Sequence, residues 1–167
     1  MDALTPQEID KAHERIFSLI IKTPLISSET INKKTNANVY FKLENLQWTG
    51  SFKLRGASNK ISQLSNEENS RGIVSYSSGN HAQAVAYASK LFGVQATIVM
   101  PKNAPSIKIE NTKNYGADVV LYDSMHESRE KIALEIAHKE NKTIVKPYDD
   151  LDVIAGRELL EKKLLRN

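Results

Sequence analysis

Apolar residues near the start of the chain recur at helical spacing. Thr5, Pro6 and Glu8 form a helix-start signal: threonine caps, proline suits the first helical position, and glutamate three residues after the cap completes a capping box. The apolar residues that follow share one helical face: Ile9, Ala12, Ile16, Leu19 and Ile20. The pattern predicts a helix from Pro6 that ends at Thr23-Pro24, because a residue before proline avoids helical dihedrals.

The next part of the chain predicts short elements. We expect a helix over residues 28–34, a turn at 36–38 and a strand over 39–43, where β-branched and aromatic residues gather. After Gly50-Ser51 the apolar period becomes helical again, which predicts a helix that Lys53 opens. Residues 66–70 are polar and are expected to form a linker.

From Gly72 onward, strand and helix patterns alternate regularly. The predicted strands are 73–76, 96–100, 119–122 and 143–146. The predicted helices are 80–92 with Gly93 as its C-terminal cap, one through Ile107 and Ile109 to Asn114, and one that Ser124 caps and that ends near Glu140. Such alternation predicts an α/β fold with a parallel sheet flanked by helices. Ligands bind such sheets outside the carboxyl ends of the strands, where residues 77–81 follow the first strand.

Composition narrows the function classes. The 167 residues are 40% hydrophobic and 26% charged, which is ordinary for a globular protein. The net charge of +3 comes from 23 basic and 20 acidic residues spread along the chain, so neither nucleic acid nor membrane is an expected partner. The absence of cysteine excludes disulfides and thiolate chemistry, and the histidines lack metal-ligand spacing, so no metal site is predicted. With no apolar run of membrane-spanning length and no signal-peptide pattern, a cytoplasmic location is expected.

Two segments can carry chemistry. Residues 50–57 read Gly-Ser-Phe-Lys-Leu-Arg-Gly-Ala and place Lys53 at a helix start, where the helix dipole and desolvation both favour a neutral amine. Residues 77–81 read Ser-Ser-Gly-Asn-His, a turn into a helix whose backbone N–H groups are suited to an anion. Taken alone, Lys53 is better explained as one of many solvated lysines, and the turn is at least as well explained as an ordinary strand-to-helix connection.

An ordered series of motifs decides between these interpretations. The chain resembles the fold-type II pyridoxal-phosphate (PLP) enzymes, in particular the threonine dehydratase and serine racemase group. Besides the two segments above, the resemblance rests on Lys-Leu-Glu-Asn at 42–45, Met-Pro at 100–101, Tyr-Gly-Ala at 115–117, Pro-Tyr-Asp-Asp at 147–150 and Val-Ile-Ala-Gly at 153–156. These motifs stand in family order and at family spacing over almost the whole chain.

The resemblance implies the roles of individual residues. Lys53 would be the Schiff-base lysine, Phe52 would pack beside the cofactor ring, and Asn80 would bond the ring hydroxyl. The substrate end would comprise Ser77, Ser78, Asn80, His81 and Arg129, with Ser78 as the acid or base opposite Lys53. A core role suits Phe52 equally well, and a solvated helix position suits Arg129.

The resemblance also implies a reaction. With PLP as electron sink, Lys53 would remove the α-proton of a small hydroxy amino acid, and loss of the β-hydroxyl would yield a keto acid and ammonia. Return of a proton from Ser78 would instead invert serine. Threonine, serine and hydroxyaspartate all remain open as substrates, and so does a non-catalytic role as a binding or assembly module.

The length of the chain departs from the family pattern. Family members are about twice as long and carry a glycine-rich phosphate loop, whereas this sequence has seven glycines and no two consecutive. Gly156-Arg157-Glu158 stands where they continue Gly-Gln-Gly-Thr. We therefore expect a truncated fold: residues 1–68 as the first part of a large domain, 69–147 as a complete small domain, and 148–167 as the start of a second large-domain segment. Residues 153–167 read as one amphipathic helix. The unmatched apolar surface predicts a homo-oligomer or association with a complementary chain.

Overall fold

The computed structural model describes residues 4–164, with side chains to residue 158. A four-stranded parallel sheet forms its centre, in the strand order β5-β4-β3-β6. The strands are β3 (Ile73–Tyr76), β4 (Ala96–Pro101), β5 (Asp118–Tyr122) and β6 (Thr143–Val145). Both central strands are buried along their whole length, which agrees with their mostly apolar sequences. The predicted parallel sheet flanked by helices is confirmed.

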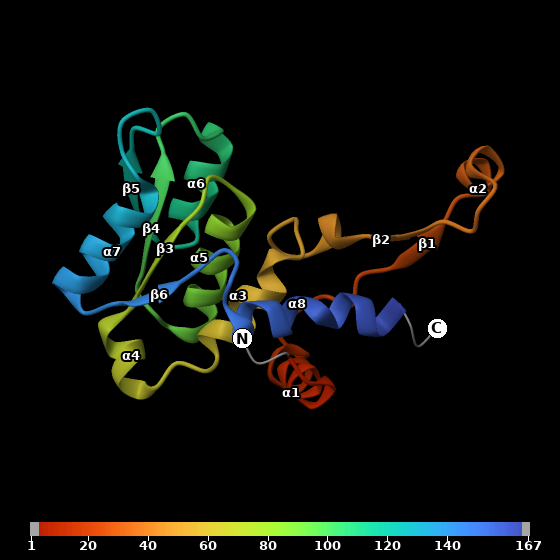
Figure 1. The fold of residues 1–167 in the computed structure, drawn as a ribbon, viewed down its shortest axis with the longest axis horizontal. Coiled ribbons are helices and arrows are strands. Elements are labelled where there is room, and N and C mark those ends of the chain that lie inside the picture. The colour runs from red at the N-terminus through yellow and green to blue at the C-terminus, as the bar shows by residue number, and fades with distance from the viewer. Residues whose placement is uncertain (1–3, 165–167) are drawn as a thin grey trace.

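Helices cover both faces of this sheet (Figure 1). Side chains alternate along β3: Ile73 faces the core formed with α5, whereas Val74 and Tyr76 face α7. Helix α3 packs on α5 from the side away from the sheet, so α5 lies between them. The helices of this region are α3 (Lys53–Ile61), α4 (Asn66–Arg71), α5 (Asn80–Phe92), α6 (Ser106–Asn114) and α7 (Arg129–Glu140).

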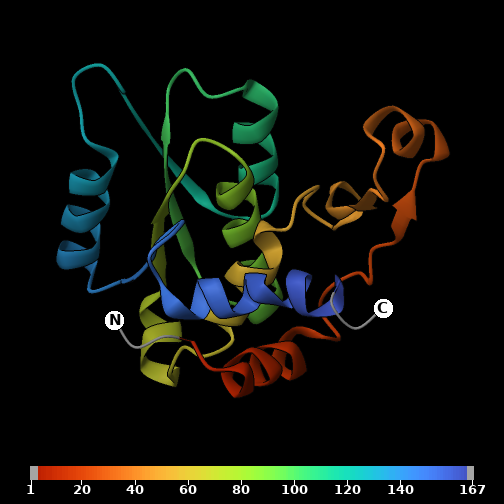
Figure 2. The same cartoon turned by 45° about the vertical axis from the view of Figure 1, so that its right-hand side comes forward.

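The rest of the chain forms a helical layer and an arm. Helix α8 crosses α3 and also contacts α1, so the last described segment packs on the first (Figure 2). The arm stands away from the sheet and contains an antiparallel two-stranded ribbon with Leu25 opposite Lys42. The elements are α1 (Pro6–Ile16), β1 (Leu25–Ser27), α2 (Glu29–Thr35), β2 (Tyr40–Lys42), η1 (Glu44–Leu46) and α8 (Leu151–Leu164).

Three local predictions were wrong, and β1 was not predicted. Helix α1 ends at Ile16 instead of at Thr23-Pro24, and Leu19 N–H then bonds Ile16 O in a turn. Beyond that turn, the side-chain amide of Gln47 pairs with both backbone groups of Ile21 (2.9 and 3.0 Å). The expected linker at 66–70 is α4, which a capping box of Ser65 and Glu68 begins.

The third correction concerns the start of α7. Ser128 caps this helix, and Ser124 lies in the preceding turn. The Glu127 carboxylate accepts a hydrogen bond from the Asp123 backbone N–H at 2.5 Å, so it belongs to the same turn. Within residues 4–164, no helix is long and apolar enough to cross a membrane.

Candidate active site

Lys53 is the first residue of α3 and lies at the meeting point of three helices. Its neighbour Leu54 is buried in the core that α3 shares with α5, which fixes the orientation of the helix start. Lys53 Nζ donates a hydrogen bond to the Pro147 carbonyl oxygen at 3.3 Å. Burial, and then the positive charge of Arg157, lower the pKa of Lys53. The side chain is therefore a free amine at a lower pH than an ordinary lysine.

Arg157 of α8 reaches the same carbonyl. Its Nη2 donates to Pro147 O, and its guanidinium carbon lies 5.7 Å from the centre of the Phe52 ring. Lys53 Nζ lies 5.4 Å from the same ring centre. Two cations thus converge on one carbonyl and one aromatic ring. Sequence analysis did not assign Arg157 to the site, although its departure from the family pattern was a usable signal.

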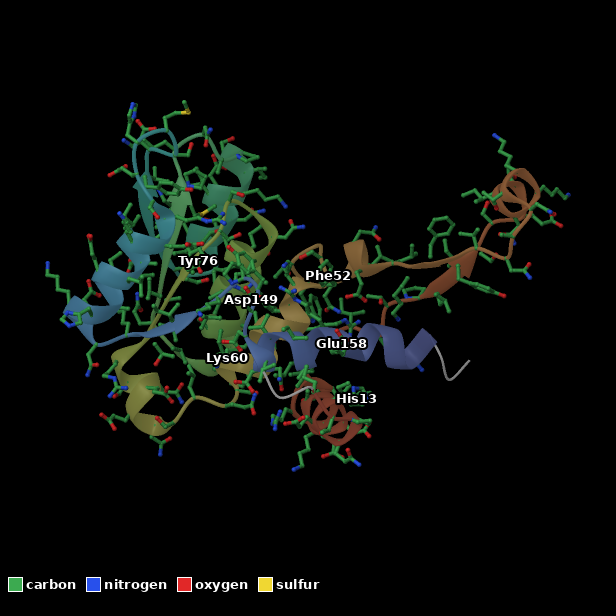
Figure 3. The ribbon with its side chains drawn as sticks, in the orientation of Figure 1. His13, Phe52, Lys60, Tyr76, Asp149 and Glu158 are labelled. Atoms are coloured by element: carbon green, nitrogen blue, oxygen red, sulfur yellow. The ribbon has the colours of Figure 1, made fainter. Side chains whose placement is uncertain are left out.

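Phe52 lies at the junction between the sheet-bearing part and the arm (Figure 3). Its side chain is 36% exposed, so it is an edge residue and not part of the main core. An aromatic ring that remains partly open beside a reactive amine can stack on a planar ligand. The predicted contact of Phe52 with a cofactor ring stays a prediction.

The turn between β3 and α5 presents polar groups at the carboxyl end of the sheet. Ser77 N–H donates to the Val99 carbonyl at 3.1 Å, and Ser77 Oγ accepts from Gly79 N–H at 3.3 Å. The side chains of Ser78 and Asn80 are exposed. Asn80 begins α5, and its Oδ1 accepts a hydrogen bond from Lys108 Nζ at 2.9 Å. The turn therefore places hydroxyl and amide groups beside the positive end of a thirteen-residue helix.

His81 connects this turn to Lys53. Only 2% of His81 is exposed, and burial, followed by the charges of Lys53 and Arg157, lowers its pKa to about 3. The imidazole is therefore neutral at physiological pH. The charges of Lys53 from α3 and Arg157 from α8 therefore both act on the buried His81 of α5.

Arg129 lies in a different environment. It is the first residue of α7, and its guanidinium carbon lies 5.6 Å from the centre of the Tyr76 ring. Tyr76 faces α7, on the opposite side of β3 from the core that contains α5. Tyr148, which follows Pro147, donates to the Glu130 carboxylate at 3.2 Å, so α7 does contact the loop that lies over Lys53. A substrate role for Arg129 stays a prediction.

A buried ion pair supports the start of α3. Arg55, 1% exposed, makes two hydrogen bonds to the Glu44 carboxylate, at 2.7 Å from Nη2 and 2.8 Å from Nε. Thr23 Oγ1 donates to the same carboxylate at 2.5 Å. Burial alone would raise the pKa of Glu44, but the bonds from Arg55 and Thr23 outweigh it and the pKa is lowered. The pair fixes α3 against the arm, two residues from Lys53.

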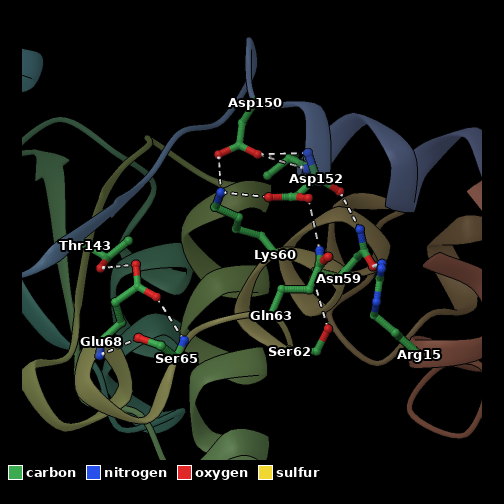
Figure 4. Close-up of polar contacts among 11 residues, drawn as sticks. Arg15, Asn59, Lys60, Ser62, Gln63, Ser65, Glu68, Thr143, Asp150 and Asp152 are labelled. Carbon is green, nitrogen blue, oxygen red and sulfur yellow. Dashed lines mark hydrogen bonds and ion pairs between the residues drawn. The ribbon is translucent and has the colours of Figure 1, made fainter. Parts of the chain in front are cut away.

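A second polar cluster attaches α8 to α3. Lys60 Nζ lies 2.9 Å from Asp152 Oδ2 and 3.1 Å from Asp150 Oδ2 (Figure 4). Asp150 Oδ1 also accepts from the backbone N–H groups of Asp152 and Val153, and so caps α8. Asn59 Nδ2 donates to the Asp152 carbonyl at 2.7 Å. These bonds fix the first turn of α8 and thereby the approach of Arg157 to Lys53.

Comparison with known proteins agrees with this geometry. A family model described as "Pyridoxal-phosphate dependent enzyme" matches residues 16–161. The chain belongs to this family. The matched span includes Lys53, the turn before α5 and the Pro147 carbonyl, which are the parts that the fold brings together. Among the described residues, no cluster of histidine and carboxylate side chains is arranged to hold a metal ion.

Several family members are similar over nearly the whole chain. Serine racemase of Schizosaccharomyces pombe is 45% identical over 160 residues, which cover 96% of this chain and 50% of that protein. The L-threo-3-hydroxyaspartate ammonia-lyase of Saccharomyces cerevisiae is 46% identical, over 92% of this chain and 47% of the enzyme. The structure of maize serine racemase superimposes with a TM-score of 0.94 at 39% identity and covers 99% of this chain and 50% of that one.

The chain spans about half the length of these relatives. They include lyases and racemases of the PLP-dependent family, which favours the enzyme interpretation over a non-catalytic module. The similarity confirms the family and fold predicted from the motifs. It does not test the roles of individual residues or the predicted domain boundaries.

Proposed function

We propose that this chain supplies the lysine-bearing part of a PLP-dependent ammonia-lyase or racemase site for small hydroxy amino acids. The observation that carries the proposal is the half-buried Lys53 amine, whose pKa burial and Arg157 lower, beside the polar turn that begins α5. An unprotonated amine is the form that bonds to an aldehyde. Threonine, serine and hydroxyaspartate are the proposed substrates, because relatives act on amino acids of this kind.

The residues around Lys53 fit the aldehyde and ring end of PLP. Lys53 offers the amine, Phe52 offers a partly open ring face, and the exposed amide of Asn80 is the proposed partner of the ring hydroxyl. When bound, PLP withdraws electrons from the α-carbon of an amino acid. The 167 residues contain no consecutive glycines, so we propose that donors for its phosphate come from another polypeptide segment.

Lys53 and Ser78 are the proposed proton carriers. As a neutral amine, Lys53 Nζ takes the α-proton of the substrate, and as an ammonium it returns one. The exposed Ser78 hydroxyl in the opposite turn supplies a proton to the other face, which would invert the α-carbon. The balance between elimination and inversion then depends on whether the β-hydroxyl leaves before Ser78 donates.

The turn before α5 is the proposed site for the substrate carboxylate. Free backbone N–H groups at the start of α5 and the hydroxyls of Ser77 and Ser78 are suited to an anion. The neutral His81 contributes no charge to this site, so it can only donate or accept a hydrogen bond there. We propose that Arg129 approaches the carboxylate from the α7 side through the loop that contains Tyr148.

The arm and η1 form the proposed association surface. Large apolar side chains remain exposed there and would be covered by a second copy or by a complementary chain that carries the other half of the family fold. They are Tyr40 (62%), Trp48 (57%), Leu46 (49%) and Phe41 (37%). In this proposal residues 69–147 are the small domain, and the segments 1–68 and 148–167 build the larger one with the partner. Light scattering that shows only monomer, alone and with that partner, would contradict the association.

Trapping of the cofactor tests the proposal. The purified chain is mixed with one equivalent of PLP, reduced with borohydride, digested and mapped by mass spectrometry. We expect the label at Lys53 and its loss in Lys53→Ala. Lys60, which is held by two carboxylates, is the internal control and should stay unlabelled. A label distributed over many lysines would show that the chain does not form a specific cofactor site.

Activity requires a second measurement. Ammonia and keto-acid release from threonine, serine and threo-3-hydroxyaspartate is compared for the chain alone and for the chain mixed with the second half of a relative. We expect turnover only in the mixture and only with PLP. Specific trapping at Lys53 without turnover in either sample would leave a cofactor-binding module and contradict the proposed enzyme.

A further inference from the structure

Arg157 and Lys53 form an arrangement that the proposed reaction does not by itself require. Both side chains donate to the Pro147 carbonyl oxygen, and both lie over the ring of Phe52. We propose that Arg157 is a positioning residue for Lys53: its guanidinium holds the Pro147 carbonyl and its fixed charge disfavours protonation of the neighbouring amine. The inference rests on the proposed function only in naming Lys53 as the reacting amine.

The sharing of one acceptor supplies the first argument. A carbonyl oxygen has two lone pairs, so it can accept from both donors. Two full positive charges on one carbonyl repel each other, and a guanidinium does not lose its proton in proteins. Lys53 can lose a proton and still donate through its amine. The repulsion is therefore relieved at Lys53, whose bond to the carbonyl is also long, at 3.3 Å.

The second argument is that helix packing holds the backbone of Arg157 in place. Arg157 directly follows Gly156, which lies against α3 so closely that a Cβ there would be 2.5 Å from the Arg55 carbonyl oxygen. The backbone that carries Arg157 is therefore held by helix packing, and the capped first turn of α8 adds the bonds of Asp150. A side chain with a fixed origin loses less freedom when it binds.

The surrounding charges leave Arg157 as the main electrostatic influence on Lys53. From α5, His81 faces Lys53 as a neutral imidazole. On the loop after β6, Asp150 is engaged by Lys60. Within η1, Glu44 is paired with Arg55. Glu158, next to Arg157, acts on the guanidinium. These three carboxylates, Asp150, Glu44 and Glu158, therefore serve other cations or Arg157.

Competitive labelling tests the inference without PLP. Trace acetic anhydride is added to the chain over a range of pH, and acetylation of each lysine peptide is quantified by mass spectrometry. We expect Lys53 to be acetylated several-fold faster near neutral pH than exposed Lys139 in the same sample. An equal rate for Lys53 and Lys139 would overturn the inference in the unmodified chain, independently of any variant.

Two substitutions separate charge from hydrogen bonding. Arg157→Gln introduces the residue of the family pattern, can still donate to Pro147 and removes the charge. We expect its Lys53 to titrate at higher pH and to react several-fold more slowly near neutral pH. Arg157→Lys keeps a cation, so its Lys53 should titrate at nearly the same pH as Lys53 of the unmodified chain. The titration of Lys60, held by its own carboxylates, should be the same in all three proteins and reports an intact helix crossing.

Each result has a definite meaning. An unchanged Lys53 titration in Arg157→Gln would assign Arg157 a structural role alone. A titration in Arg157→Lys that matches Arg157→Gln would overturn the argument from charge. The labelling experiment contains no cofactor, so its result is independent of PLP trapping. If PLP trapping fails but Lys53 titrates at low pH, the proposed function is contradicted and this inference stands. Specific trapping at Lys53 together with an ordinary Lys53 titration would support the proposed function and overturn this inference.

Discussion

Gly56 and Gly156 face each other where α3 crosses α8. A Cβ on Gly56 would lie 2.5 Å from the Val153 carbonyl oxygen, and a Cβ on Gly156 would lie 2.9 Å from the Gly56 Cα. The two helices can approach this closely only because both residues lack a side chain. The crossing places Arg157 beside Lys53, although the two residues are far apart in sequence.

The crossing predicts a stability effect. Gly156→Ala should destabilise the chain by about 1–3 kcal/mol, because a methyl group would overlap backbone that cannot move away. Urea unfolding followed by circular dichroism measures the change. Lys139→Ala, on the exposed side of α7, is the control for the introduced alanine and should leave stability within about 0.5 kcal/mol. Equal stability of Gly156→Ala and the unmodified chain would contradict the close crossing.

The Glu44–Arg55 pair predicts a large loss of stability when the Glu44 carboxylate is replaced by an amide. Glu44→Gln leaves the buried Arg55 guanidinium without its counter-charge and should cost about 3 kcal/mol. Glu29→Gln is the matched control, because Glu29 makes only an exposed contact with Lys33 at 4.0 Å. Comparable losses for the two variants in urea unfolding would show that the pair contributes little.

The same pair predicts acid sensitivity. The pKa of Glu44 is lowered in the folded chain, so its contribution to stability is present above the unfolded pKa and is lost as pH falls through the folded pKa. Unfolding free energies measured at decreasing acidic pH should fall less steeply in Glu44→Gln than in the unmodified chain. Parallel pH profiles for the two proteins would contradict this assignment.

His81 predicts a separate pH dependence. Its pKa falls from 6.5 to about 3 on folding, so the unfolded state binds a proton first and stability declines as pH falls below 6.5. The contribution of one such site is about 1.4 kcal/mol per pH unit. His81→Asn should remove this slope between pH 6.5 and the acid transition of the carboxylates. Equal slopes for His81→Asn and the unmodified chain would contradict this assignment.

Asp150 predicts the dependence of α8 on its cap. Asp150→Ala removes the acceptor for two backbone N–H groups and one carboxylate of the Lys60 cluster, and should cost about 1–2 kcal/mol. Hydrogen exchange should show faster exchange at the start of α8 and unchanged exchange in β4. Uniform acceleration across the chain would indicate global destabilisation instead of local loosening.

Sequence alone determined the alternation of strands and helices after Gly72. The alternation of strand and helix patterns and the glycine at the end of α5 are local signals, and both were read correctly. The helix that begins at Lys53 and the turn before α5 were also found from local pattern, and the family motifs identified the family. These features are predictable because the residues that create them are neighbours in the chain.

Tertiary structure decided the path of the chain after α1 and the composition of the site. The Gln47 side chain hydrogen-bonds to both backbone groups of Ile21, which is distant in sequence, and no local pattern predicts this contact. Arg157 joins Lys53 for a similar reason: a helix crossing between two glycines brings the carbonyl of Pro147 within reach of both. Local periodicity records which face of a helix is apolar, but only the packing of one helix on another selects which distant charges meet.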